Sequence, residues 1–138
     1  MKTQNYNINF SDLTLVIPAK EEPDCLQQVL EELEEFNLNK IVVIPLGIEL
    51  PTNWNFSKLK IVNQQKNGYG NAILTGIEKV NTKYFCIFNA DGSFDPNELK
   101  NLIETVKKFD FVFSSRYLKN ASSDDDTILT YLGNYIFS

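Results

Sequence analysis

Residues 84–98, YFCIFNADGSFDPNE, carry three structural signals in one continuous stretch. Residues 84–88 form an almost purely apolar run, which is typical of a strand buried on both faces of a sheet. A polar turn, residues 89–93, follows this run. Residues 95–98, DPNE, then indicate a helix start, with an N-cap aspartate, a proline at the first helical position and a glutamate that closes a capping box. Strand, turn and helix in this order predict one unit of an α/β fold.

Asp91 is the only carboxylate in the polar turn, and it lies just beyond the carboxyl end of the predicted strand. In open α/β sheets, ligands bind outside the carboxyl ends of the strands, so Asp91 is a candidate for a metal or phosphate site. Aspartate is also a common turn former, and Gly92 follows it directly. The local sequence supports these two interpretations about equally.

The same alternation of strand and helix runs through the rest of the chain. Four further strands are predicted at residues 13–17, 40–44, 59–63 and 110–113, and helices begin near residues 23, 71, 96 and 127. The first helix shows apolar residues at helical spacing: Leu26, Val29, Leu30, Leu33 and Phe36. This order of elements predicts a mostly parallel, doubly wound (Rossmann-like) sheet with helices on both faces.

The length, charge and residue types of the chain exclude several classes of function. The chain has 138 residues, which suits one domain, and its net charge of −5 argues against a general nucleic-acid binder. It contains no histidine, which removes Ser-His and Cys-His nucleophile systems and histidine-based zinc sites. Cys25 and Cys86 are expected to be reduced structural thiols. The polar N-terminus and the absence of a long apolar run lead us to expect a protein that is located in the cytoplasm or at the cytoplasmic face of a membrane.

A polar or glycine-containing loop follows each predicted strand. Because the carboxyl ends of parallel strands meet at one edge of the sheet, these loops are expected to converge there. The convergence favours Asp91 as a site residue over a turn former alone. The loops are residues 18–22, 45–47, 67–70, 89–91 and 114–116.

Four short motifs occur in order and without large gaps: IPAKEEPDCL at 17–26, GYGNAILTG at 68–76, FNADGSFDPNEL at 88–99 and SSRY at 114–117. In turn, they resemble an I-P-A-x-N-E first-strand signature, a G-x-G-x-A…G segment, a D-x-D turn with its D-P-x-x-L helix, and a G-S-R motif. Together these are the motifs of the family-2 glycosyltransferases with the GT-A fold, most closely the branch similar to dolichol-phosphate mannose synthases. The resemblance covers about residues 12–137, and four ordered motifs are a stronger signal than one.

The resemblance implies a nucleotide-sugar-binding domain that uses Mg²⁺ or Mn²⁺ to hold the donor diphosphate. Carried over to this chain, Asp91 is the metal-side carboxylate, and Asn89 is the second metal ligand. Asp91 and Arg116 are then the catalytic candidates, because a cation and a guanidinium can stabilise the departing diphosphate. The residues that would border the nucleotide or shape its loop are Pro18, Ala19, Glu22, Gly68, Gly70, Asn89 and Asp91.

The chain departs from the family pattern at two places. Asn89 stands where the first acid of D-x-D is usual, and residues 44–48, IPLGI, replace a V-D-D-G-S segment. A neutral amide weakens a cation site, since it contributes no charge. These departures keep open a second interpretation, in which the chain is a degenerate, non-catalytic binding or assembly module.

The resemblance also has consequences for the end of the chain. Residues 1–138 are expected to form a single domain that lacks the acceptor part and is truncated at the C-terminus. Residues 127–138, TILTYLGNYIFS, are expected to mediate peripheral association with a membrane. The expected acceptor of the sugar is a polyprenyl phosphate or a glycan. A nucleotidyltransferase is disfavoured because the loop at 18–23 has no glycine, and a dinucleotide dehydrogenase because the loop at 68–70 lacks the third glycine.

Overall fold

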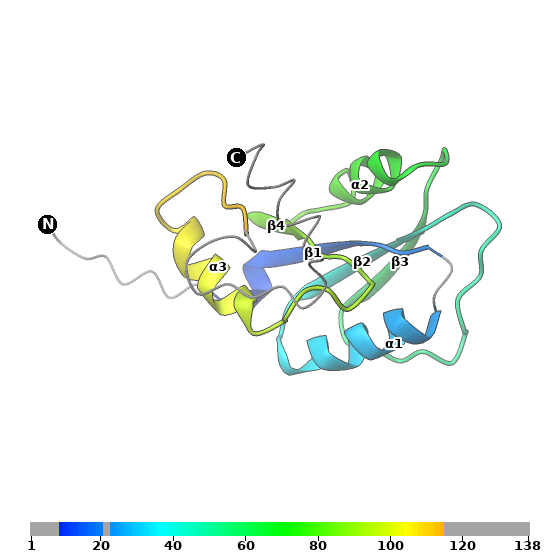
Figure 1. Ribbon diagram of the computed structural model, residues 1–138, viewed down its shortest axis with the longest axis horizontal. Coiled ribbons are helices and arrows are strands. Elements are labelled where there is room, and N and C mark those ends of the chain that lie inside the picture. Colours follow the sequence, from blue (N-terminus) through cyan, green and yellow to red (C-terminus); the bar gives the residue numbers. More distant parts are fainter. Residues whose placement is uncertain (1–8, 21–22, 115–138) are drawn as a thin grey trace, which may run out of the picture.

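The computed structural model describes residues 9–20 and 23–114. The elements in chain order are η1 (Phe10–Asp12), β1 (Leu13–Pro18), α1 (Pro23–Glu32), η2 (Leu33–Glu35), β2 (Asn39–Ile44), β3 (Leu59–Asn63), α2 (Tyr69–Ile77), β4 (Tyr84–Ile87) and α3 (Glu98–Val106), where η marks a 3₁₀ helix. Strands and helices alternate along most of the chain, as the hydrophobic pattern predicts (Figure 1).

The four strands form one sheet in the order β3-β2-β1-β4, and every neighbouring pair is parallel. β1 lies at the centre, where Val16 is in register with Ile41 of β2 on one side and Ile87 of β4 on the other. All carboxyl ends of the strands therefore lie at the same edge of the sheet. The predicted parallel α/β sheet is confirmed.

Helices cover both faces of this sheet. Leu15 and Ile17 of β1 belong to the larger core, which contains the apolar residues of α1 and α3. Val16, which points to the other face, packs in a second core with Ala72 of α2. Figure 1 shows α1 and α3 on one side of the sheet and α2 on the other. The doubly wound arrangement explains why the first five residues of β1 are all buried and, apart from Thr14, apolar.

Helix α2 lies very close to the sheet at Gly76. A Cβ atom added to Gly76 would run into Cγ1 of Val16 and also press on Cγ2 of Val43. Both valines are fully buried, so neither has room to move aside. The glycine therefore sets the depth at which α2 packs, and α2 begins in one of the loops at the carboxyl edge.

Lys40, near the start of β2, lies on the same face of the sheet as the larger core. It is unusual there because it is charged and only 1% of its side chain is exposed. Its Nζ lies 2.7 Å from Oε1 of Glu34, and Oε2 of Glu34 accepts a hydrogen bond from the backbone N–H of Ser57. Burial disfavours the charged carboxyl, but the bonds from Lys40 and Ser57 and the charge of Lys40 outweigh it. The pKa of Glu34 therefore lies below its ordinary value of 4.5.

Two strand predictions require correction. Residues 110–113 form no strand, and Phe111 and Phe113 are 80% and 86% exposed. The residue types favour a strand, but a strand also needs a neighbour for its backbone groups, and none of the described residues supplies one. For the same reason β4 is not buried on both faces. Within the described residues β1 is its only partner, and Phe85 is 47% exposed.

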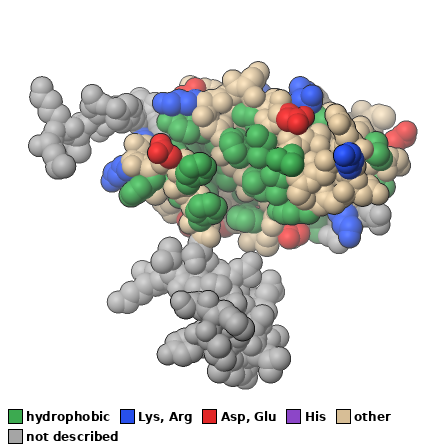
Figure 2. Space-filling model, turned by 90° about the horizontal axis from the view of Figure 1, so that it is seen from above, with side chains coloured by type: hydrophobic (Ala, Val, Ile, Leu, Met, Phe, Trp, Pro, Cys, Tyr) green, Lys and Arg blue, Asp and Glu red, His purple; other side chains and the backbone are tan. Residues whose placement is uncertain are grey.

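Phe85 lies on the α2 side of the sheet, because its partner in register, Thr14, lies on the same face as Val16. Figure 2 looks onto this side and shows hydrophobic side chains gathered on the surface. The exposed apolar residues of this side include Leu74 of α2, at 61% exposure. Helix α2 thus covers β1 and β2 well but leaves part of β4 uncovered.

Helix boundaries differ from the prediction by a few residues. Helix α2 begins at Tyr69 instead of position 71, and α3 begins at Glu98. The predicted N-cap is wrong: Asn97, not Asp95, is the N-cap of α3, and its side chain makes no capping bond. Oδ1 of Asp95 accepts a hydrogen bond from the backbone N–H of Asn97 in the turn before the helix. The carboxylate of Glu98 bonds to the side chain of Asn101 instead of closing the expected capping box. No helix in the described part of the chain is long and apolar enough to cross a membrane.

Candidate functional site

The loops at the carboxyl edge continue directly from the strand ladder. The backbone N–H of Ala19, just after β1, donates to the carbonyl of Val43 at 2.9 Å. In the same way, the N–H of Phe88, just after β4, donates to the carbonyl of Val16 at 2.9 Å. These bonds fix the starting direction of both loops. Pro18 and Ala19 therefore lie at the same edge as Asn89, as the sequence predicts.

The glycine loop before α2 reaches the turn after β4. Gly68 precedes the helix with a φ of +115°, a conformation that L side chains rarely adopt, and Tyr69 is the first helical residue. The hydroxyl of Tyr69 donates a hydrogen bond of 2.9 Å to Oδ1 of Asn89. Two motifs that are 20 residues apart in the sequence thus meet at one point of the edge.

Further hydrogen bonds hold the glycine loop in place. The backbone N–H of Gln64 continues the ladder to the carbonyl of Ile44 at 2.8 Å, and its side chain is buried. From there Nε2 of Gln64 donates to the carbonyl of Lys66, whose own N–H donates to Oδ1 of Asn71. A buried amide thereby ties the end of β3 to the first turn of α2.

Asp91 lies in a well-formed turn. Its Oδ1 accepts hydrogen bonds from both the backbone N–H and the hydroxyl of Ser93, at 3.0 and 2.6 Å. Gly92, between them, has a φ of +75°. The turn-forming role of Asp91 is therefore real. It is compatible with a role in ligand binding, because the residue is exposed and follows Asn89 at the carboxyl edge.

The loop after β2 has a different character. The N–H of Ile48 bonds to the carbonyl of Pro45 at 3.3 Å, and Gly47 turns the chain with a φ of +81°. Leu46, at the tip, is 58% exposed. This part of the edge presents an apolar side chain where the resemblance leads one to expect carboxylates.

The donor set at the edge fits a hard divalent cation only when a ligand completes its coordination. Asp91 provides a carboxylate, and one acceptor position of the Asn89 amide oxygen is taken by Tyr69. Among the described residues, no group of three or more His, Cys, Asp or Glu side chains could hold a metal ion. Mg²⁺ is commonly bound by one or two carboxylates together with substrate phosphates, and the residues present fit that mode.

The sequence-predicted site residues fall into two groups. Six of them lie at the carboxyl edge in the structure: Pro18, Ala19, Gly68, Gly70, Asn89 and Asp91. Glu22 and Arg116 lie outside the described residues, as does the predicted helix of residues 127–138. The sequence interpretation missed Tyr69 and Gln64. A tyrosine between two glycines and a glutamine directly after a strand were the available signals, but neither residue type reveals its partner.

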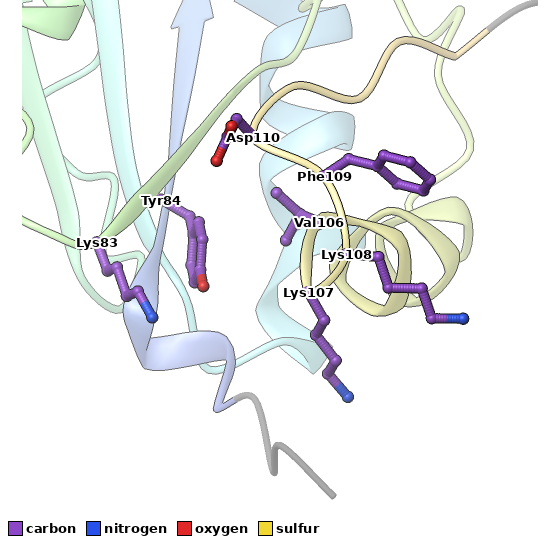
Figure 3. Close-up of a pocket in the computed structure, with 7 residues that line it drawn as sticks. All are labelled: Lys83, Tyr84, Val106, Lys107, Lys108, Phe109 and Asp110. Carbon is purple, nitrogen blue, oxygen red and sulfur yellow. The ribbon is translucent and has the colours of Figure 1, made fainter. Parts of the chain in front are cut away.

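The structure also has a hollow at the opposite edge, with a volume of about 620 Å³ (Figure 3). Tyr84, the first residue of β4, lies in it, and Lys107 and Lys108 point outward from its rim. Nζ of Lys83 lies 5.0 Å from the centre of the Tyr84 ring, and Lys107 pairs with Glu104. Since β4 begins here and Asn89 lies beyond its other end, at Ile87, this hollow is separate from the carboxyl edge.

Comparison with known proteins shows the family of the chain. The family model described as "Glycosyl transferase family 2" matches residues 49–135, which include β3, α2, β4 and α3. A protein of Methanocaldococcus jannaschii, named "Uncharacterized protein MJ1222", is 25% identical over 146 aligned positions. The alignment takes in 98% of this chain but only 60% of that relative's length. No solved structure matches the chain. Because the family model covers more than half of the residues, the chain belongs to glycosyl transferase family 2.

Proposed function

We propose that this chain binds the donor of a glycosyltransferase, a nucleotide-diphosphate sugar, at the carboxyl edge of its sheet. Membership of glycosyl transferase family 2 supports sugar transfer in general. The observation that carries the proposal is the hydrogen bond between Tyr69 and Asn89, because it joins the glycine loop to the turn that contains Asp91. The motifs further suggest the branch similar to dolichol-phosphate mannose synthases, with a polyprenyl phosphate as acceptor.

The chemistry requires stabilisation of a negative leaving group. An oxygen of the acceptor attacks the anomeric carbon, and the bond from that carbon to the nucleotide diphosphate breaks, so the diphosphate leaves with the electron pair. A divalent cation, when bound, would neutralise part of that charge. Asp91 would hold the cation, and Arg116 would supply a positive fork to the phosphate oxygens. A phosphate acceptor is already ionised and needs no strong general base.

The start of α2 adds a second contribution. The first backbone N–H groups of a helix have no partner within it, and the helix dipole makes this end positive. Gly68 and Gly70 have no atom within 4 Å of where a Cβ would lie, so the backbone there is open to an anionic ligand. The amino end of α2 is therefore suited to receive the diphosphate that Asp91 and its cation approach from the other side.

A second candidate function is a non-catalytic binding or assembly module that kept the fold of the family. The observation that favours it is the loop after β2, where Leu46 is exposed in place of the expected acids. One carboxylate in the turn after β4, instead of two, points in the same direction.

Isothermal titration calorimetry with UDP, GDP and their sugar conjugates, with and without Mn²⁺, separates the two candidates. Asp91→Asn keeps the shape of the turn but removes its charge. We expect it to weaken Mn²⁺-supported binding at least roughly tenfold, the effect of losing one contact with a charged group. Asp110→Asn, at the opposite edge, is the matched control and should leave binding unchanged. If the native chain binds no nucleotide with or without Mn²⁺, the donor-binding proposal fails and the non-catalytic module is favoured.

A further inference from the structure

We propose that Asn89 donates a hydrogen bond to the diphosphate, with Tyr69 as the positioning residue that holds its amide. The inference rests on the proposed function and assigns Asn89 a role different from that of a metal ligand. Its consequence is that donor binding depends less on the divalent cation than it would with an aspartate at this position.

The starting observation is the use of the Tyr69 hydroxyl. Tyr69 is 58% exposed, so burial of its ring does not account for its place at the start of α2. Its hydroxyl donates to Oδ1 of Asn89 at 2.9 Å. In this bond the oxygen end of the Asn89 amide faces the Tyr69 hydroxyl.

The geometry of an amide then decides what Asn89 offers elsewhere. The oxygen and the NH₂ group lie at opposite corners of a planar group, and the NH₂ group carries two donors. With Oδ1 bonded to Tyr69, the NH₂ group of Asn89 faces away from the Tyr69 hydroxyl and has its two donors left for a ligand. At the carboxyl edge, Asn89 therefore presents two N–H donors, while Tyr69 occupies one of the two acceptor positions of its oxygen. Anionic phosphate oxygens are suitable partners for such donors.

Charge at the edge supports the same role. With an aspartate at position 89, two carboxylates would repel the diphosphate, and a cation would be needed to bridge them. Asn89 leaves Asp91 as the single acid of the turn. The neutral amide both lowers this repulsion and adds a donor. Asparagine in place of the usual aspartate weakens the metal site, and a direct hydrogen bond from Asn89 to the diphosphate compensates for that loss.

The test compares the affinity of the full chain for UDP in Mn²⁺ with its affinity in EDTA. The ratio of the two affinities measures dependence on the cation. Asn89→Asp should raise this ratio roughly tenfold, because it removes a hydrogen bond to a charged group and restores the second acid. Tyr69→Phe should raise it roughly threefold, since the released amide can turn its oxygen to the cation.

Tyr84→Phe, at the opposite edge, is the matched control and should leave the ratio unchanged. Thermal melts of each variant establish that the protein is folded. Equal loss of affinity with and without Mn²⁺ in Tyr69→Phe would mean a merely structural role, and a fall in the ratio would mean that Tyr69 holds the oxygen for the cation. Either result overturns the inference, as does an unchanged ratio in both variants. Failure of the native chain to bind either UDP or GDP would overturn the proposed function as well.

Discussion

Replacement of Gly76 by alanine tests how closely α2 packs on the sheet. The added Cβ would meet Cγ1 of Val16 and Cγ2 of Val43, and both valines are completely buried. Overpacking of a closed core costs about 1–3 kcal/mol, since side chains or the helix backbone must shift. The higher helix propensity of alanine offsets this cost by up to about 1 kcal/mol. We therefore expect Gly76→Ala to lower the free energy of unfolding by about 1–2 kcal/mol.

The matched control is Gly70→Ala in the same helix. No atom lies within 4 Å of the position that its Cβ would take, and φ at Gly70 is not in the left-handed region. Here the propensity gain is unopposed, so we expect stabilisation by about 0.5–1 kcal/mol.

Differential scanning calorimetry measures both effects. For a domain of this size, 1 kcal/mol corresponds to about 3–5 °C in the midpoint of thermal unfolding. Gly76→Ala should lower the midpoint by about 3–10 °C, whereas Gly70→Ala should raise it by about 1.5–5 °C. Equal shifts in both variants, or a rise in Gly76→Ala, would refute the inferred close contact between α2 and β1.

Two further predictions concern the buried charge and the thiols. Glu34→Gln leaves the Lys40 ammonium buried without its ion-pair partner, so it should cost about 1–2 kcal/mol in urea unfolding, whereas Lys40→Met should cost less than about 1 kcal/mol. Because the pKa of Glu34 is lowered, the effect of Glu34→Gln should be fully present above pH 4.5 and vanish as the pH falls through that lowered value; a constant difference would contradict the ion pair. Burial raises the pKa of the Cys86 thiol to about 11 while Cys25 is exposed, so iodoacetamide at pH 8 should label Cys25 first, and equal labelling by mass spectrometry would be the contrary result.

The hydrophobic pattern predicted the fold well where the residues of an element alone decide its structure. The apolar spacing in α1 matches its buried face, because a helix of this pattern can bury only one side. The mostly apolar sequence of β1 likewise matches a strand covered by helices on both faces. Parallel order then followed from the alternation of strand and helix, and with it the edge at which the loops meet.

The pattern was wrong where pairing partners decide the structure. Residues 110–113 have strand-forming side chains but no strand beside them among the described residues, and Phe111 is largely exposed. The burial of Lys40 could not be predicted from the sequence either, because it depends on the ion pair with Glu34. A charged residue at a strand start is usually solvated, so only the folded contact reveals it.

The candidate site shows the same division. The positions of Asn89 and Asp91 beyond β4 were predictable, since they follow from the strand ending at that edge. The bond between Tyr69 and Asn89 was not, because a hydrogen bond between two loops has no local sequence pattern. That contact is the observation on which we propose Asn89 as a donor to the diphosphate.

The most direct test of the central claim is paramagnetic broadening in NMR spectra of the ¹⁵N-labelled chain with Mn²⁺ and UDP. A cation bound with UDP at the carboxyl edge should selectively broaden the amide signals of residues 19–20, 68–70 and 89–92. Signals of residues 83–84 and 106–110, at the opposite edge, should stay sharp. Mn²⁺ without UDP should broaden the first set much less, because the diphosphate completes the coordination. Broadening centred on the opposite edge, or none with UDP present, would contradict the account.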